Sequence, residues 1–407
     1  MSAFRALRHR DFSLYFFGQL VSMVGTWMQN VALGYWVYRI TGKESMLGLV
    51  MFAATAPSVF LIPIGGLAAD RIPARRLLLI TQTVYLVQAL GMAALAFLGY
   101  STMGPILALA VLLGTITAFD LPGRQVLVAQ VVDKEDLPNA IALQSTLFHG
   151  SRILGPALAG LVVAATSEGW CFLLNAVSYL AALATLFVIH THPVADTRTG
   201  RGSLDHLAEG FRFIWREKAF RHLIGLLALI VGLGMPFTAL LPAVAKGALH
   251  GGPRELGWLG AASGLGATLG AVLLASRKNA LGLDKTLVAF ALLFALFLGA
   301  FSLTHHFWLA LALIPFTSFC LASFNTSCNT LAQIMAPDAL RGRVMALYTM
   351  VFMAAMPLGT LAMGFLAQRV SLSWALTIGA ACCLMGALIF AGIHPRSPEM
   401  PAETEAS

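Results

Sequence analysis

Charged residues are scarce in this sequence, and their scarcity excludes most soluble folds. Lysine, arginine, aspartate and glutamate make up only 11% of the 407 residues, whereas hydrophobic residues make up 58%. In a soluble domain about a quarter of the residues are usually charged, and a soluble protein this apolar would expose large uncovered patches. Lipid is the solvent that fits, so the composition predicts an integral membrane protein.

Alternation of polar and apolar residues is also lacking, which excludes a transmembrane barrel. Barrel strands are segments of about 10 residues with a period of two, whereas the apolar runs here are much longer. Backbone groups in a bilayer have no water to bond, so a spanning segment must be a helix or part of a closed barrel. The apolar runs are therefore predicted to be helices, which gives an all-α membrane protein.

Residues that build covalent frameworks or catalytic sites are few. The five cysteines lie inside apolar runs and are Cys171, Cys320, Cys328, Cys382 and Cys383. Free thiols that pack as small hydrophobic groups are expected, not a disulfide framework. The sequence has no metal-ligand cluster, nucleophile elbow or glycine-rich phosphate loop. We expect no enzymatic activity, no metal and no other cofactor.

Uncharged intervals predict twelve transmembrane helices, because a span needs roughly 20 apolar residues. One interval is too long for a single helix, and Gly99, Gly104 and Pro105 divide it into spans three and four. Arg152 alone interrupts the fifth span. The spans are expected within residues 11–39, 44–70, 76–120 (two spans), 136–168, 169–190, 223–245, 256–275, 287–303, 307–332, 344–367 and 371–393.

The placement of basic residues predicts the orientation. The net charge of +8 does not indicate a nucleic-acid partner, because most of the 26 lysines and arginines lie in short segments that flank apolar runs. Such segments are typical of cytoplasmic loops, and most of these residues fall on the side of the N-terminus. Both termini are therefore expected in the cytoplasm, with the lipid bilayer as the surrounding partner.

A long polar stretch divides the chain into two halves. Residues 1–190 and 223–393 are expected to form one six-helix half each, joined by a cytoplasmic linker at 191–222 and followed by a disordered tail at 394–407. Within the linker, apolar residues recur at helical spacing: Leu204, Leu207, Phe211 and Ile214. Both an amphipathic helix on the membrane surface and a plain linker fit this pattern.

An internal repeat supports the division. One constant shift aligns Gly155 with Gly359 and Gly160 with Gly364, and so places the fifth span on the eleventh. Parallel repeats of six helices are typical of transporters of the major facilitator type.

The segment between the second and third spans resembles the signature motif of the major facilitator superfamily. Its characteristic residues are Gly66, Asp70, Arg71, Arg75 and Arg76. Pro73 stands where the family usually has glycine. The arginines can bind carboxylates or the C-terminal ends of helices. The resemblance implies two six-helix pseudo-symmetric bundles that alternate access, with this segment as a latch between them; an ordinary basic loop is the alternative.

A second motif lies in the fifth span. Ser151, Gly155, Pro156 and Gly160 resemble the glycine–proline motif of the exporter branch of the superfamily. Small residues let helices pack closely in lipid, and proline bends a span. The resemblance implies export, and close packing without any directional meaning is the alternative.

Longer stretches resemble the enterobactin-exporter-like subgroup, the transmembrane secretion effectors. They are residues 18–29, 118–125, 136–145 and 341–348. The resemblance covers the chain up to about Ile393 and implies a multi-pass protein of the bacterial cytoplasmic membrane.

Arg152 is interpreted as the one charged side chain deep in an apolar run. An intramembrane charge costs at least about 2.5 kcal/mol, so it should face a cavity or a partner. No embedded carboxylate is expected to pair with it. A substrate carboxylate or catecholate is one candidate partner; backbone carbonyls, or Asp120 at the cytoplasmic end, are the other.

Other polar residues are candidates for a substrate or proton pathway. His149 lies close to Arg152 on the helix and titrates near neutral pH, so it is a candidate proton carrier, or merely a hydrogen-bonded histidine. The remaining candidates are Gln19, Ser22, Thr26, Gln29 and Asn30 of the first span and Gln144 of the fifth. They either line a cavity or bond across helices, because unpaired polar groups are costly in lipid.

Four further charges are candidates for an inner gate. Asp120 and Arg124 are expected on the cytoplasmic loop after the fourth span, and Arg341 and Arg343 precede the eleventh. A surface ion pair of little energetic consequence is the alternative for Asp120 and Arg124.

These predictions point to a secondary transporter. It is expected to export a small hydrophobic or amphiphilic compound, siderophore-like or drug-like, as a monomer that alternates access. No nucleotide-binding motif is present, so an ion gradient is expected to supply the energy, with protons as the expected coupling ion. A lysophospholipid flippase or a solute importer of the same fold is an alternative, and a membrane sensor or enzyme is the alternative from another class.

Overall fold

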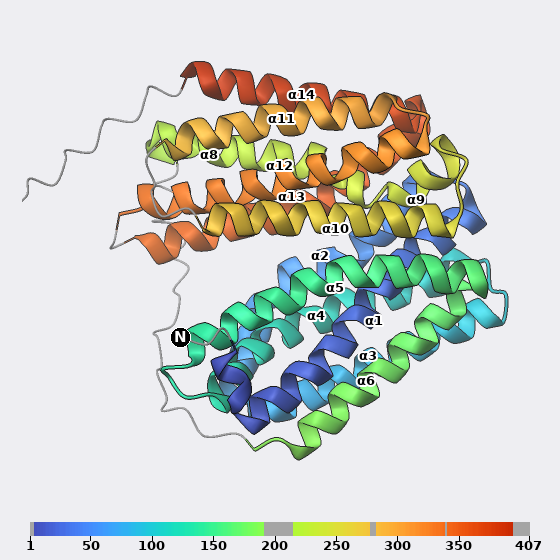
Figure 1. The fold of residues 1–407 in the computed structure, drawn as a ribbon, viewed down its shortest axis with the longest axis vertical. Helices are drawn as coiled ribbons and strands as arrows, with labels where there is room; N and C mark the ends of the chain where they lie inside the picture. The colour runs from blue at the N-terminus through green and yellow to red at the C-terminus, as the bar shows by residue number, and fades with distance from the viewer. Residues whose placement is uncertain (1–3, 191–214, 277–281, 338–339, 394–407) are drawn as a thin grey trace, which may run out of the picture.

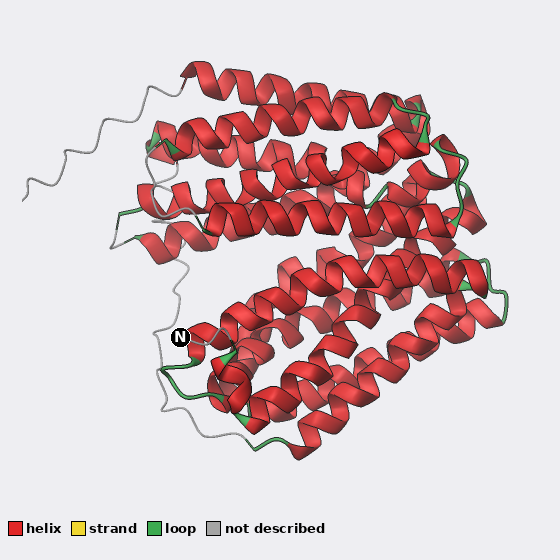
Figure 2. Cartoon of the chain, in the orientation of Figure 1, coloured by secondary structure: helices red, strands yellow, loops and turns green. Residues whose placement is uncertain are grey.

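A computed structural model shows two helical halves (Figure 1), and it describes residues 4–190, 215–276, 282–337 and 340–393. Within these ranges the structure contains helices and no strands, joined by short loops (Figure 2). The predicted linker helix and the C-terminal tail lie outside the described residues, apart from the few linker residues from 215 onward. The all-α prediction is confirmed.

The N-terminal half contains a short 3-10 helix at Arg5–Arg8 and six long helices. These are α1 (Arg10–Thr41), α2 (Glu44–Arg71), α3 (Ala74–Phe97), α4 (Met103–Val131), α5 (Leu137–Ala165) and α6 (Glu168–Val188). Gly42 ends α1 and Gly99 follows α3, both in the left-handed region that glycine adopts without strain. The predicted break between spans three and four is therefore confirmed.

The C-terminal half repeats this arrangement with one irregular helix. Its elements are α8 (Lys218–Leu229), a π-helical turn (Ile230–Gly234), a 3-10 turn (Met235–Thr238), α9 (Leu241–Ala243), a second π-helical turn (Val244–Ala248), α10 (Pro253–Ala275), α11 (Leu283–Leu303), α12 (Phe307–Met335), α13 (Arg341–Val370) and α14 (Leu372–Ile393). Its core is apolar and aromatic, with Phe237 packed against Phe294 and Phe301 at ring-centroid distances of 6.4 and 6.2 Å.

The seventh span departs from the prediction of one continuous helix at 223–245. The α-helical segment ends at Leu229, and the chain continues as π, 3-10 and short α turns up to Ala248. Pro236 and Pro242 lack the amide hydrogen that an α-helix needs. At Gly232 the chain also packs closely against α13, because a Cβ on Gly359 would overlap the backbone of Gly232. The interruption therefore follows from the two prolines together with the packing of Gly232 against Gly359.

The fourth span also departs from the prediction, because α4 does not end at Asp120. It runs on through Pro122 to Val131, so Asp120 and Arg124 are helical residues rather than loop residues. Proline is tolerated inside membrane helices when neighbouring groups satisfy the freed backbone.

The span count stays a prediction for one helix. Eleven helices of the described chain are long and apolar enough to cross a membrane, counting Lys218–Thr238 as one. The remaining long helix, α1, has 32 residues and carries several polar side chains.

The two halves touch mainly through two equivalent helix pairs, with smaller contacts of α1 to α9 and α10. The main contacts join α5 to α10 and α2 to α13. A Cβ on Gly160 would lie 2.8 Å from the Cα of Gly257, and a Cβ on Gly364 would lie 3.0 Å from the Cα of Gly48. Gly160 and Gly364 are the positions that the internal repeat pairs, so the repeat in the sequence is also a repeat of packing.

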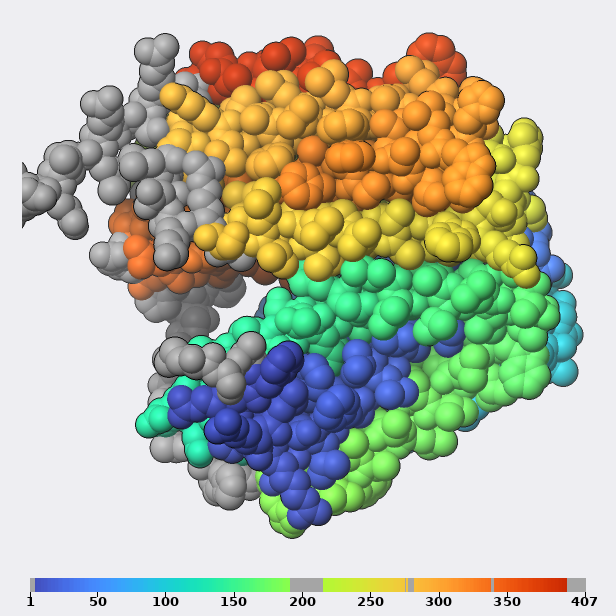
Figure 3. Space-filling view, viewed as in Figure 1, coloured from blue at the N-terminus to red at the C-terminus, as the bar shows by residue number. Residues whose placement is uncertain are grey.

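Both glycine contacts lie towards the same end of the molecule, where α1 ends and α2 begins; we name it the closed end. At the opposite end, where α1 begins and α14 ends, the halves diverge (Figure 1). The space-filling view is hollowed between the halves on that side (Figure 3), and we name it the open end. The molecule is thus a V whose apex is the closed end.

Candidate functional site: buried polar groups between and within the halves

A buried ion pair lies inside the N-terminal half, contrary to the expectation that no carboxylate is embedded. Arg124 donates from Nε to Oδ2 of Asp120, and the side chains are 17% and 4% exposed. Oδ1 of Asp120 accepts from Thr81 Oγ1 at 2.8 Å and from Gln82 Nε2 at 2.9 Å. Both partners come from α3, so the carboxylate is satisfied on all sides.

The pair extends to α1. Arg124 donates from Nη1 to Oε1 of Gln19, which links α1 with α4. Nε2 of Gln19, Oε1 of Gln82 and the hydroxyl of Tyr15 are buried around it without a hydrogen-bond partner in the described chain. The surface-pair alternative for Asp120 and Arg124 is therefore wrong, since the pair is enclosed by three helices.

A second polar cluster, nearer the closed end, joins α1, α3 and α6. Gln29 donates to Gln88 Oε1 at 3.0 Å and accepts from Asn175 Nδ2 at 2.8 Å. Thr26 and Tyr179 share a hydrogen bond of 3.0 Å. Sequence analysis missed Gln88, Asn175 and Tyr179; polar residues inside the third and sixth spans were the signal that could have identified them.

The polar residues of α1 therefore bond mostly within the N-terminal half. Gln19, Thr26 and Gln29 make the contacts above, and Ser22 is buried with an unpartnered hydroxyl. Asn30 is partly exposed, as is Gln144 on α5. Of the two alternatives for the first span, bonding across helices accounts for most of the stripe in this conformation.

Among the described residues of the C-terminal half, no ion pair occupies the positions equivalent to Asp120 and Arg124. At the shift that aligns Gly155 with Gly359, Phe324 takes the place of Asp120 and Cys328 that of Arg124, and both are fully buried. Its cross-helix polar contacts are smaller, such as the hydroxyl pair of Ser263 and Ser318 at 2.7 Å. The halves thus share packing but differ in chemistry.

Arg152 lies on α5 beside α1 rather than beside an acid. Its guanidinium carbon is 5.8 Å from the centroid of the Trp27 ring. Within the described chain it makes no hydrogen bond or ion pair, and Asp120 is bonded to Arg124 instead. His149 is partly exposed, and its Nδ1 is buried without a partner in the described residues.

The motif of the fifth span forms the packing surface between α5 and both neighbours. Ser151 is fully buried. A Cβ on Gly155 would overlap Trp27, and a Cβ on Gly260 would lie 2.6 Å from the Cβ of Pro156. The motif is therefore a close-packing surface at which α5 meets α1 and α10.

The signature motif lies at the open end and is only partly engaged. Arg75 donates to the carbonyls of Leu186 and Phe187 at 2.7 Å each, so it caps the C-terminal end of α6. Gly66, Asp70 and Arg71 belong to the last turns of α2. In the part of the chain that the structure describes, Asp70, Arg71 and Arg76 are exposed and form no ion pair.

The four candidate gate charges do not form one cluster. Arg341 and Arg343 lie in the first turn of α13 at the open end. All side-chain bonds of Asp120 and Arg124 go to residues of the N-terminal half.

Two ion-pair groups that sequence analysis missed hold the ends of the N-terminal half. At the closed end, Arg39 makes a two-pronged contact with Glu168, at 2.6 and 3.1 Å. At the open end, Asp136 accepts from Arg5 at 2.7 Å and from His9 at 2.8 Å. Both groups join segments far apart in sequence, which is why spacing gave no sign of them.

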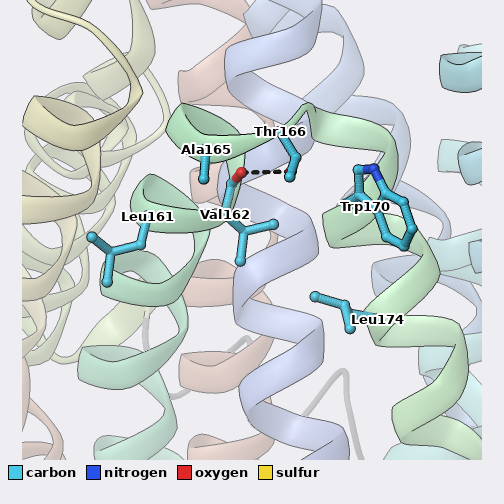
Figure 4. A pocket seen from close by; sticks show the side chains of 6 residues that line it. All are labelled: Leu161, Val162, Ala165, Thr166, Trp170 and Leu174. Carbon is cyan, nitrogen blue, oxygen red and sulfur yellow. Dashed lines mark hydrogen bonds between the residues drawn. The ribbon is translucent and has the colours of Figure 1, made fainter.

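Two surface hollows lie at the closed end. One, of about 410 Å³, is lined by Tyr38, Glu44, His250, His305 and Ser371 among others. The other, of about 330 Å³, lies between α5 and α6 and is shown in Figure 4. In the latter, the hydroxyl of Thr166 bonds to the carbonyl of Val162 at 2.7 Å, and the lining is otherwise apolar apart from the indole N–H of Trp170. Among the described residues no group of three metal ligands occurs.

Comparisons with known proteins agree with this architecture. The family model of the transmembrane secretion effectors matches residues 1–407. The chain is 25% identical over 369 residues to the multidrug efflux pump Tap of Mycolicibacterium fortuitum, covering 88% of this chain and 90% of that one. It is 25% identical over 350 residues to the enterobactin exporter EntS of Shigella boydii, covering 84% and 81%.

A solved structure shows the same fold. A crystal structure of a mutant of the nucleoside transporter NupG superimposes with a TM-score of 0.75 at 14% identity, covering 95% of this chain and 100% of that one. The two-half prediction is thereby confirmed as the major facilitator fold, and the protein is a multi-pass membrane transporter rather than an enzyme. The chain belongs to the transmembrane secretion effector family of the major facilitator superfamily.

Proposed function

We propose that this protein is a secondary active exporter of small hydrophobic or amphiphilic compounds in the bacterial cytoplasmic membrane. The observation that carries the proposal is the V shape, with the halves packed at one end by α2 against α13 and α5 against α10. A solute reaches the space between the halves from the open end and leaves when the packing exchanges ends. This is alternating access by rocking of two repeats.

The open end is the cytoplasmic end in this proposal. Basic side chains gather there, including Arg5, Arg71, Arg75 and Arg341, as the positive-inside rule requires for cytoplasmic segments. Both termini then lie in the cytoplasm, and the structure represents the inward-facing state. The exporter names of Tap and EntS support outward transport, and the packing motif of α5 lies at the interface that must open for release.

Protons are the proposed coupling ion, and the protein is proposed to work as a monomer. Asp120 is the carboxylate in the middle of a described spanning helix, and protonating it would release Arg124 from its charged partner. Exchange of this proton requires a state in which the surrounding Thr81 and Gln82 bonds open. The pair thus supplies a two-state element that a proton can bias.

Inverted membrane vesicles test the proposal directly. Vesicles that contain the protein are loaded from outside with amphiphilic fluorescent dyes, and an acid interior is imposed. Uptake that follows the gradient and stops with a protonophore supports proton-coupled export. Absence of any gradient response, compared with vesicles that lack the protein, refutes it. Uptake that needs an acid exterior instead would identify an importer of the same fold.

A further inference from the structure

Arg152 is a cation at membrane depth that has no acidic partner among the described residues. It lies near the middle of α5, which spans Leu137–Ala165. In contrast to Arg124, which is neutralised by Asp120, Arg152 has no acidic partner in the described chain. A charge inside a membrane is retained only when it faces a cavity or a counter-charge. Burying the charge of Arg152 at this position therefore costs free energy that packing alone does not offset.

The surroundings of Arg152 lie where the two halves meet. Its own backbone carbonyl lies 2.6 Å from where a Cβ on Gly264 of α10 would be, so α5 and α10 are in contact at this level. Trp27 of α1 covers one face of the guanidinium at 5.8 Å. Phe148 meets Trp27 edge-on, with ring centroids 5.7 Å apart, and is 40% exposed. The group thus has a cation flanked by aromatic surface, at the junction of α1, α5 and α10.

A purely structural role explains the contact of Arg152 with the Trp27 ring but leaves the N–H donors of Arg152 without an acceptor among the described residues. A structural arginine would donate to backbone carbonyls or to an embedded acid, and within the described residues Arg152 does neither. The repeat gives the same indication, because Met356 takes its place in the C-terminal half and packs without a charge. The fold at this position therefore does not need an arginine.

We propose that Arg152 and Trp27 form a binding subsite for an anionic group of the exported solute. This inference rests on the proposed function and names the substrate class: an aromatic or amphiphilic compound that carries a carboxylate or a similar planar anion. A guanidinium binds such a group through two parallel hydrogen bonds. The Trp27 and Phe148 rings contact the apolar part, as apolar walls with few polar groups do in ligand sites.

A matched pair of probes separates charge recognition from apolar binding. 1-Pyrenebutyrate and 1-pyrenebutanol share one aromatic body and differ in one anionic group. Binding is measured by equilibrium dialysis to the full-length protein in phosphatidylcholine nanodiscs, against protein-free discs. Arg152→Gln is expected to weaken pyrenebutyrate binding about tenfold or more and to leave pyrenebutanol within about twofold. Arg152→Lys keeps the charge but not the planar fork, so it is expected to fall between.

Two further variants keep the test decisive. Trp27→Ala is expected to weaken both probes, because it removes shared apolar surface. Arg8→Gln, which removes an exposed arginine at the open end, is expected to change neither. An equal effect of Arg152→Gln on both probes, or no effect on either, overturns the subsite. If Arg152→Gln does not yield folded protein, the other two variants decide. The subsite is overturned if Arg152→Lys leaves the affinity for pyrenebutyrate unchanged and Trp27→Ala leaves the affinity for both probes unchanged.

The anion could also come from a lipid headgroup, and nanodisc composition distinguishes the two sources. Replacing part of the phosphatidylcholine by phosphatidylglycerol is expected to change pyrenebutyrate affinity less than about threefold if the site takes a solute. Strong competition by the anionic lipid overturns the solute assignment.

Transport measured in parallel separates this inference from the proposed function. If Arg152→Gln leaves gradient-driven dye uptake intact and the protein shows no preference for the anionic probe, the exporter proposal stands and the subsite fails. Arg152-dependent binding without any gradient-driven uptake means that the subsite stands and the exporter proposal fails.

Discussion

Separating the charges of Asp120 and Arg124 should destabilise the protein more than removing both. Asp120→Asn leaves the Arg124 guanidinium enclosed with one neutral partner, Gln19, and breaking a buried pair from one side costs about 3–5 kcal/mol. Arg124→Gln leaves a carboxylate that still accepts from Thr81 and Gln82, so its loss is expected at about 3 kcal/mol, the lower end of that range.

The double variant decides the matter. Asp120→Asn combined with Arg124→Gln removes both charges and keeps polar groups that can bond each other, so a loss of about 1–3 kcal/mol is expected, well below the sum of the single losses. The measurement is thermal unfolding of each variant in nanodiscs, followed by intrinsic fluorescence, with the exposed Arg71→Gln as a control for a plain change of charge. If the single losses simply add, the two side chains are not coupled and the ion-pair argument is refuted.

Three further substitutions have matched controls. Gly160→Val should push α5 away from Gly257 and so shift the population several-fold towards molecules separated at the closed end, as measured by spin-label distances. Gly150→Val is the control, because its added Cβ has open space, and equal effects of the two variants would contradict the packing argument. Arg75→Ala should lower the free energy of unfolding by about 1–2 kcal/mol, because two hydrogen bonds to the end of α6 are lost. Replacing the exposed Arg76 by alanine should change it by no more than about 0.5 kcal/mol, and equal losses would contradict the capping role of Arg75. Gln29→Leu should cost about 1–3 kcal/mol by stranding Gln88 and Asn175, while Asn30→Leu should change unfolding little; a neutral Gln29→Leu would mean that the cluster is hydrated.

The helical spans could be predicted because lipid removes charge from most of a spanning segment. The ends of α1 and α2, at Thr41 and Arg71, lie within two residues of the charges that bound the first two predicted spans. The same rule failed at Asp120, because a charge inside the span was taken for its boundary. Asp120 and Arg124 are four residues apart and neutralise each other on one helix face, and that spacing was the signal that could have extended the fourth span.

The candidate site was predictable in its members but not in its contacts. Arg152 and the polar stripe of the first span could be found by their rarity in apolar runs. Their partners could not, because Trp27, Gln88 and Asn175 come from other helices, and only the packing of those helices decides which polar groups meet. The irregular seventh span was signalled by Gly232, Gly234, Pro236 and Pro242, but its π turns depend on contact with Gly359.

The uneven chemistry of the two halves has a consequence for how the protein is made. The ribosome releases the N-terminal half first, and the buried bonds of Asp120, Arg124, Gln29 and Asn175 all end on residues of that half. The first six helices can therefore form this ion pair and this amide cluster in the membrane while the rest of the chain is still being synthesised. The second half has Phe324 and Cys328 at the equivalent positions, so no charge pair has to be satisfied there on insertion. The two halves thus share a packing pattern but differ in the polar groups that insertion has to satisfy, because the cross-helix polar bonds described in the second half join hydroxyl groups such as those of Ser263 and Ser318.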